Sequence, residues 1–183
     1  MNCECLCPPP PHPSPTHQIS PNSPSSVIQY TNTGGVINTF SEFIDSIIRD
    51  TRREDLDILS GMFADKNRLE ISFRDYMELL ITHVEKNDPK GENTMLYMIF
   101  LLTRLRQKGI TINYYNVARI ILILFILVTK LLDDNAYTNS DWAYLFMLRT
   151  NEINSMEMKL LKILDYNIFI RDEHIKHIMK CIV

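Results

Sequence analysis

The sequence predicts an all-α protein: a single helical domain with a buried central helix, preceded by a disordered N-terminal tail. Eight of the nine prolines fall within residues 1–35. Beyond that point, apolar residues recur with a helical period between short polar or glycine-containing breaks, and no strand alternation of useful length competes with them. A chain of 183 residues with 45% hydrophobic content can bury one core of ordinary size. We therefore assign residues 1–35 to the tail and residues 36–183 to one helical domain.

The tail is rich in proline, serine, threonine and asparagine. Such a segment buries too little apolar surface to offset the entropy that it would lose on ordering. Ser14, Ser20 and Ser23 each precede a proline, which is the dipeptide that proline-directed kinases phosphorylate. A proline-rich and serine-rich segment contains some of these dipeptides by chance, so we interpret the three serines as possible phosphorylation sites.

The cysteines lie at the two ends of the chain and cannot staple a core. Three of them, Cys3, Cys5 and Cys7, stand in the tail, and Cys181 lies near the other end. This distribution predicts a reducing, intracellular compartment, cytoplasm or nucleus or both, and the N-terminus lacks the pattern of a secretory signal. The tail cysteines with His12 could instead form a lipidation or redox site, although a chance cluster is the simpler interpretation.

The first helix is predicted from about Phe40 to Arg53. Thr39 and Glu42 have the spacing of a capping box, and the apolar stripe comprises Ile37, Phe40, Ile44 and Ile47. A second helix begins at Ser72, where Ser72 and Asp75 repeat the capping spacing. Its apolar face comprises Phe73, Tyr76, Met77, Leu80, Ile81 and Val84.

Two longer helices follow, at about 92–108 and 114–133, joined by "GITIN". The second of them contains "IILILFILV", residues 120–128, the most apolar stretch of the chain. That stretch is too short to cross a bilayer, and Arg119 and Lys130 flank it closely. Because this helix is apolar nearly all round, we expect it at the centre of the domain with the other helices packed about it.

Three shorter helices complete the prediction. "TNSDWAYLFML" opens one of them, with Thr138 and Asp141 at capping spacing. "INSMEMKLLKILDYNIF", residues 153–169, forms the next helix and its exit, and residues 172–182 form the last. In the helix that begins near Ile153, Glu157 projects about 20° from Leu164, so a carboxylate lies at the edge of the apolar stripe.

Glu157 has a counterpart in Lys130, which lies on the apolar stripe near the end of the central helix. Lys130 could simply favour the helix C-terminus, a cation there being worth about 0.3 to 1 kcal/mol, while Glu157 extends to water. Alternatively, both charges face a partner protein, where charges set within apolar surface fix the geometry of an interface. The helical pattern leaves both interpretations open.

The segments that contain these two charges resemble a known family. "VTKLLDDNAYTNSDWAY" and "TNEINSMEMKLLKILDYNIFI" are similar to the cyclin box of the phosphate-pathway cyclins of yeast and the P/U-type cyclins of plants and protists. The resemblance extends more weakly back through "ISFRDYMELL" to about Val36. The matching positions are Lys130, Asp133, Asp134, Tyr137, Asn139, Trp142, Ala143, Glu152, Asn154, Met156, Glu157, Leu161, Asp165 and Tyr166.

This resemblance implies a single cyclin box that binds and activates a cyclin-dependent protein kinase. Lys130 and Glu157 would contact the kinase near its regulatory helix. The apolar contacts beside them would come from Leu131, Leu161 and Ile168.

The resemblance assigns a further contact to the acidic pair Asp133 and Asp134. One of these carboxylates, Asp134 in particular, could hold an arginine of the activation segment of the kinase. A solvated helix end remains an equally good interpretation of the pair.

The sequence departs from the family pattern at the end of the short helix. Phe146 and Met147 stand where the family usually has two glycines, so either the turn differs or the helix runs longer. The arginine-containing substrate-docking motif of mitotic cyclins is not evident in "ISFRDYMELL", and a second cyclin repeat is missing. We therefore expect no substrate-docking groove of that kind.

Other classes of function have less support. The hallmarks of a kinase and a convincing nucleophile with its partner are absent, which predicts a protein that is not an enzyme and needs no cofactor. A net charge of −3 without a basic patch favours neither nucleic acid nor membrane as a partner. A cyclin-fold adaptor that binds a non-kinase protein is the main alternative.

His174, His177 and Cys181 share one helical face and could ligate zinc if a fourth group approached. We interpret them instead as a polar flank beside an apolar face, and we assign no metal site.

Overall fold

The computed structural model describes residues 33–174, except for positions 51, 68, 85–90 and 172. In the described ranges the regular elements are helices joined by turns and loops, and the β pairing is limited to one isolated parallel bridge between Arg49 and Asn113. The predicted all-α class is therefore confirmed. The helices are α1 (Thr33–Ile47), α2 (Ile58–Gly61), α3 (Phe73–Val84), α4 (Gly91–Gln107), α5 (Val117–Leu132), α6 (Asn139–Leu145) and α7 (Thr150–Ile163), with a 3-10 turn, η1, at Arg53–Asp55.

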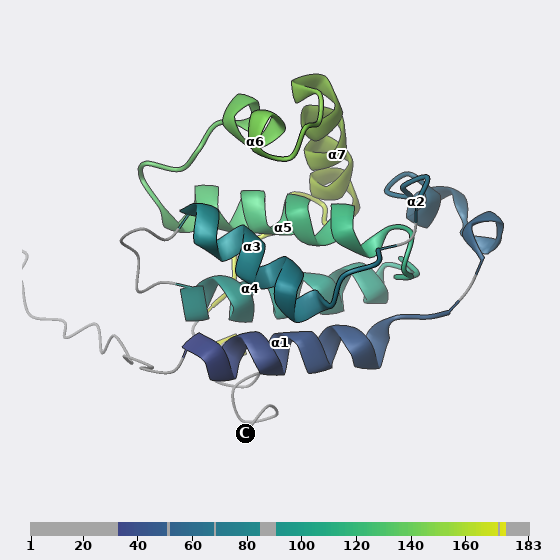
Figure 1. Cartoon of the computed structure of the whole chain (residues 1–183), viewed down its shortest axis with the longest axis horizontal. Helices are drawn as coiled ribbons and strands as arrows, with labels where there is room; N and C mark the ends of the chain where they lie inside the picture. The colour runs from purple at the N-terminus through teal and green to yellow at the C-terminus, as the bar shows by residue number, and fades with distance from the viewer. Residues whose placement is uncertain (1–32, 51, 68, 85–90, 172, 175–183) are drawn as a thin grey trace, which may run out of the picture.

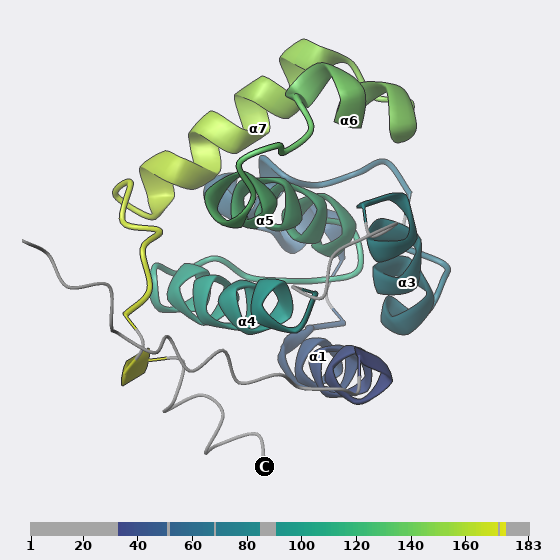
Figure 2. The same cartoon turned by 90° about the vertical axis from the view of Figure 1, so that its left-hand side faces the viewer.

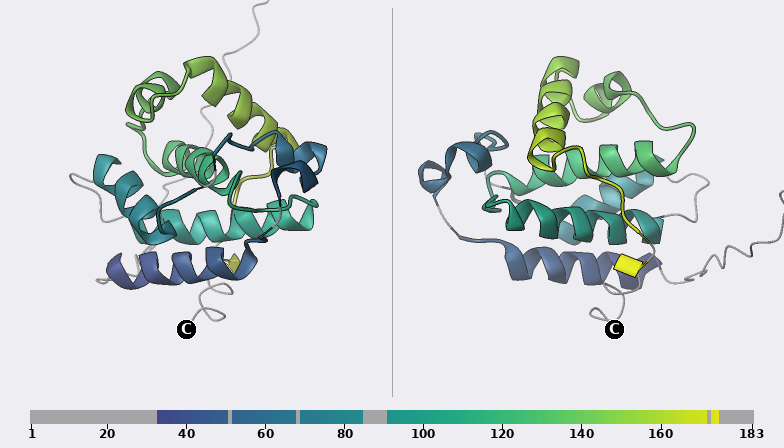
Figure 3. Two further views of the ribbon diagram at one scale, coloured as in Figure 1. Left: turned by 45° about the vertical axis from the view of Figure 1, so that its right-hand side comes forward. Right: turned by 180° about the vertical axis from the view of Figure 1, so that it is seen from behind.

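Helix α5 lies at the centre of the fold. Seen end-on, it has α4 and then α1 below it, α3 to one side, and α6 with α7 above it (Figure 2). Its residues from Ile120 to Thr129 are all buried, as expected for a helix that is apolar all round. The chain leaving α7 then passes alongside α4 (Figure 3), where the ring of His174 lies 5.3 Å from that of Phe100. Of the described helices, none is both long and apolar enough to span a bilayer.

The first helix differs from its predicted bounds at both ends. Helix α1 begins at Thr33, so the Thr39–Glu42 capping box is wrong. Thr39 lies inside the helix, and its hydroxyl donates to the Gly35 carbonyl at 2.9 Å. Helix α1 ends at Ile47 rather than near Arg53, because the backbone N–H of Arg49 then donates to Ile112 O at 2.9 Å. The predicted stripe is nevertheless buried in full: Ile37, Phe40, Ile44 and Ile47.

Two of the predicted caps are confirmed. The N–H of Asp75 donates to Ser72 Oγ at 3.1 Å where α3 begins. Thr138 caps α6 with a reciprocal capping box, in which its own N–H donates to Asp141 Oδ2 at 2.8 Å. The Thr138 hydroxyl also donates to Asp141 Oδ2, at 2.6 Å, and this bond together with that from the Thr138 N–H holds the pKa of the Asp141 carboxyl below its ordinary value.

The segment around α2 has no counterpart in the sequence prediction. A buried polar network, which we call the Asn116 network (Ser60, Thr111, Asn113 and Asn116), ties it to the loop between α4 and α5. The Asn116 side chain accepts from Asn113 N at 2.9 Å and donates to Ser60 O at 3.2 Å and Thr111 O at 2.8 Å. The Ser60 hydroxyl accepts from Thr111 N at 2.8 Å. Ser60, Asn113 and Asn116 are all 0% exposed, so this network serves the interior of the fold.

Several predictions lie outside the described residues. They are the tail of residues 1–32 with its serines and cysteines, and nearly all of the last helix, including His177 and Cys181.

Candidate functional site

The end of α5, the start of α6 and the middle of α7 bring four polar side chains together. The Lys130 Nζ lies 2.6 Å from Glu157 Oε1 and donates to Asn139 Oδ1 at 2.7 Å. The Asn139 Nδ2 donates to Glu157 Oε2 at 2.5 Å and to Asn154 Oδ1 at 2.7 Å. We call these four residues the Lys130 network. The two charges singled out by the sequence therefore meet directly, although 27 residues separate them along the chain.

The Lys130 network remains open to solvent. The side chain of Lys130 is 32% exposed and that of Glu157 is 15% exposed. Glu157 thus lies at the edge of the buried face of α7, as the helical pattern predicts, and Lys130 covers one of its oxygens. An ion pair with this exposure contributes little to folding, about 0 to 1 kcal/mol, and both side chains keep some surface that another molecule can reach.

Packing around Trp142 fixes α6 on α5. The indole of Trp142 is 0% exposed, and its ring centroid lies 5.8 Å from those of Phe125 and Tyr137, edge to face. The ring of Phe146 stacks on it at 6.0 Å. Together with the Thr138–Asp141 capping box, this aromatic cluster sets the position of Asn139 at the first residue of α6.

The apolar residues expected beside the charges differ in exposure. Leu131 is 37% exposed, whereas Leu161 and Ile168 are partly buried and pack against the core. Helix α7 and its exit add exposed apolar groups that the sequence analysis did not assign: Met158 within the helix, and Tyr166 and Phe169 after it, at 46%, 59% and 70% exposure. Tyr166 was one of the matched motif positions, but its outward orientation could not be inferred from the motif. The role of each residue in an interface stays a prediction.

The two aspartates after α5 lie in different environments. Asp133 is the C-cap residue of α5, and its carboxylate accepts from Asn135 N at 2.9 Å. Asp134 is exposed and has no hydrogen-bond partner among the residues that the structure describes. Of the two, Asp134 is therefore the carboxylate that can accept a guanidinium from outside, and that role also stays a prediction.

The turn after α6 contains a residue in the left-handed conformation, although neither of the two glycines of the family pattern is present. Met147 has a φ of 52° and is 94% exposed. Leu148 N donates to Ala143 O at 2.9 Å and Met147 N to Tyr144 O at 3.4 Å, which is the hydrogen-bond pattern of a Schellman motif. The helix does not run longer, and a methionine occupies the position that favours glycine.

A second charged cluster braces the other end of α5. Arg119 Nε lies 3.1 Å from Asp65 Oδ2, and its Nη1 lies 2.9 Å from Glu152 Oε1 at the start of α7. Burial opposes ionisation of Asp65, but the Arg119 charge and hydrogen bonds from the backbone of Lys66 and Asn67 lower the pKa of that carboxyl below its ordinary value. Because Arg119 is satisfied within the chain at 22% exposure, we interpret this cluster as structural.

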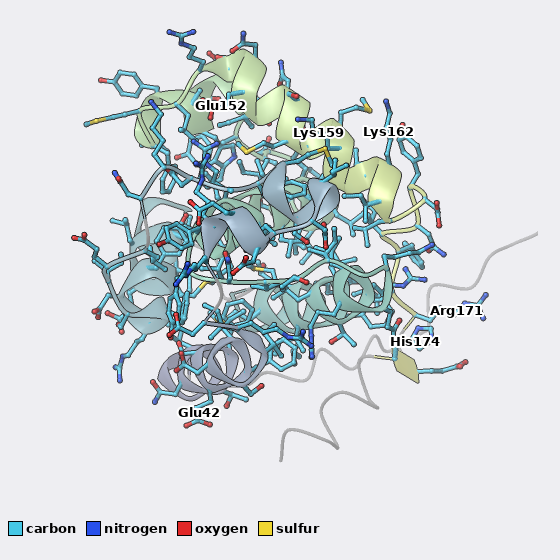
Figure 4. All side chains as sticks on the ribbon, turned by 90° about the vertical axis from the view of Figure 1, so that its right-hand side faces the viewer. Glu42, Glu152, Lys159, Lys162, Arg171 and His174 are labelled. Carbon is cyan, nitrogen blue, oxygen red and sulfur yellow. The ribbon has the colours of Figure 1, made fainter. Side chains whose placement is uncertain are left out.

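The zinc alternative gains nothing from the described part of the chain. His174 lies with Arg171 beyond the end of α7, far from Glu152 at its start (Figure 4). Among the described residues, no three histidine, cysteine, aspartate or glutamate side chains are grouped as metal ligands would be.

Comparison with known proteins gives the same family as the motifs. The family model described as Cyclin matches residues 25–168. The chain is also 27% identical over 118 residues to the PHO85 cyclin-like protein psl1 of Schizosaccharomyces pombe, an alignment that covers 63% of this chain and 47% of that protein. The chain thus spans about half the length of the curated relative that it matches. These matches confirm the resemblance to phosphate-pathway, P/U-type cyclins, and the chain belongs to the cyclin family.

Proposed function

We propose that this chain is the regulatory subunit of a cyclin-dependent protein kinase and that the Lys130 network is the centre of its kinase-binding surface. The observation that carries the proposal is the pairing of Lys130 with Glu157 at a solvent-open junction of three helices. Membership of the cyclin family and the similarity to a PHO85 cyclin-like protein support a kinase as the partner.

The hydrogen-bonding capacity of the Lys130 network fits such a partner. The ammonium of Lys130 has three donors and uses two within the chain, on Asn139 and Glu157. Each oxygen of Glu157 accepts one hydrogen bond within the chain and can accept another. The network is therefore satisfied in the free chain but not saturated. A partner that offers an acceptor to Lys130 and donors to Glu157 would complete it.

In the proposed surface, Leu131, Leu161 and Ile168 would add apolar contacts, and Asp134 would add a carboxylate. The mechanism would be a population shift, since binding that is tighter to the active arrangement of the kinase than to the inactive one raises the active fraction. In this proposal the chain itself carries out no chemistry.

A charge-swap series tests the proposal in a binding assay with the purified kinase that co-purifies with the full chain. Lys130→Glu and Glu157→Lys each place like charges side by side, and we expect each to weaken binding by about 2 to 5 kcal/mol. The double variant restores the ion pair with reversed polarity, so it should fold normally yet still bind poorly.

The exposed pair Arg74 and Glu78 on α3 provides the matched control. Swapping those two charges should leave kinase binding unchanged. Full kinase affinity in the double variant at Lys130 and Glu157 would show that the pair serves only the fold. Recovery of a non-kinase partner in place of a kinase would favour the adaptor instead.

A further inference from the structure

Asn139 is the residue of the Lys130 network that contacts both charges and carries none. We propose that Asn139 is a positioning residue: it fixes the relative placement of Lys130 and Glu157, and thereby the geometry of the kinase-binding surface. This inference rests on the proposed function, because it names the residue that organises the same surface.

The chemistry of an amide suits this position. The Asn139 oxygen accepts from the Lys130 ammonium at 2.7 Å, while its nitrogen donates to the Glu157 carboxylate at 2.5 Å. A primary amide presents an acceptor to a cation and a donor to an anion at once. The opposite amide orientation would direct N–H groups at an ammonium and an oxygen at a carboxylate. The two charges therefore specify the orientation of the amide, and the amide specifies the spacing of the charges.

The backbone of Asn139 is held independently of both charges. It directly follows Thr138, whose capping box closes the first turn of α6, and the buried Trp142 follows three residues later. The amide of Asn139 is therefore delivered from a fixed helix end. Lys130 and Glu157, by contrast, are long side chains with several rotatable bonds, and without a third contact they could pair in many geometries.

A double-mutant cycle, with kinase affinity as the measured quantity, tests this role. The set is wild type, Asn139→Ala, Glu157→Ala and the double variant, each as the full chain. We expect Asn139→Ala to weaken binding about 10-fold in the wild-type background and less than about 2-fold once Glu157 is absent. Asn139→Asp should weaken binding more than Asn139→Ala, because it places a second carboxylate against Glu157.

Asn151→Ala is the matched control. Asn151 is an exposed asparagine in the first turn of α7 and lies outside the Lys130 network, so we expect its change to alter affinity by less than about 2-fold. Equal losses for Asn139→Ala with and without Glu157 would mean that Asn139 acts through the general stability of α6, and the positioning role would then be rejected.

A second double-mutant cycle measures folding stability and therefore needs no kinase. The same four variants are unfolded with denaturant, with the fluorescence of Trp142, the single tryptophan of the chain, as the signal. We expect the folding constant of the double variant Asn139→Ala, Glu157→Ala to differ by about 5-fold from the value that the two single variants predict if they act independently. For the control pair Asn139→Ala and Glu78→Ala, we expect the two effects to be independent. If no kinase binds the wild-type chain, the proposed function fails while this cycle still decides the role of Asn139. A coupling below about 1.5-fold would overturn that role.

Discussion

The Asn116 network and the Lys130 network each have a single asparagine at their centre, Asn116 in the first and Asn139 in the second. They differ in burial and charge. Asn116 is 0% exposed, and its side-chain amide bonds to backbone groups of Asn113, Ser60 and Thr111. Asn139 is half-buried, and its amide bonds to an ammonium, a carboxylate and a second amide. The first arrangement closes on itself in the interior. The second leaves charged groups at the surface with capacity for further bonds, so the same side chain serves folding in one place and is suited to recognition in the other.

The largest effect on stability is expected in the Asn116 network. Asn116→Ala removes three hydrogen bonds and leaves their backbone partners in the interior, which should lower the free energy of unfolding by about 3 kcal/mol. Equilibrium denaturation measures this loss, with the exposed Asn154→Ala as control. A loss below about 1 kcal/mol would show that water can replace the buried amide.

A smaller stability effect is expected in the Lys130 network. Lys130→Ala removes one ion pair at 32% exposure, and we expect the free energy of unfolding to fall by about 1 kcal/mol or less. The same variant should weaken kinase binding by more than that. A stability loss as large as that of Asn116→Ala would erase the distinction between the two networks.

How well the sequence predicts a feature of this fold depends on how far apart the interacting residues lie along the chain. Ser72 and Thr138 were found as caps because a cap and its partner lie three residues apart. The start of α1 was missed because glycines at positions 34 and 35 read as a break, although they lie in its first turn.

Helix α2 is too short to show a period, and Asn116 meets Ser60 across 56 residues, which no local pattern encodes. The helical pattern singled out Lys130 and Glu157 as charges on apolar stripes, but only the family resemblance favoured the interpretation that both face a partner. The motif also contained Asn139, but the hydrogen bonds that join it to both charges appear only when α5, α6 and α7 are packed together.

The cluster of Arg119, Asp65 and Glu152 is about as exposed as the Lys130 network, with side-chain exposures of 22%, 42% and 34%, and its contribution to stability should depend on pH. The pKa of Asp65 is lowered in the folded chain, so the ionised form stabilises the fold. This contribution is present above the ordinary pKa of an aspartate, about 3.9, and is lost as the pH falls through the lower pKa of the folded state.

Asp65→Asn should therefore lower stability at neutral pH by about 1 kcal/mol or less, and the difference from wild type should shrink in acid. Thermal denaturation at a series of pH values measures that difference. The lowered pKa of Asp141 acts in the same direction in both proteins and cancels in the comparison. A difference that grows in acid would contradict the assignment.

The smallest effect concerns the turn that follows α6, close to the Lys130 network but outside it. Met147→Gly relieves a left-handed conformation that costs a non-glycine residue about 1 to 2 kcal/mol, and part of this gain is lost to the greater flexibility of glycine in the unfolded chain. We expect a net stabilisation of about 0.5 kcal/mol, measured as a rise in the midpoint of denaturation. Kinase affinity should not change, since the side chain of Met147 is 94% exposed and takes no part in the network.

The control is the reverse kind of substitution, Gly109→Ala, at another position with a positive φ. Gly109 lies two residues beyond the end of α4 with a φ of 90°, and a Cβ built there would meet nothing within 4 Å. Gly109→Ala should therefore destabilise the chain through backbone conformation alone, by about 1 kcal/mol. If Met147→Gly stabilises the fold but also weakens kinase binding, the exposed methionine is itself part of the surface, and the boundary of the recognition region must be extended beyond the start of α6 to its end.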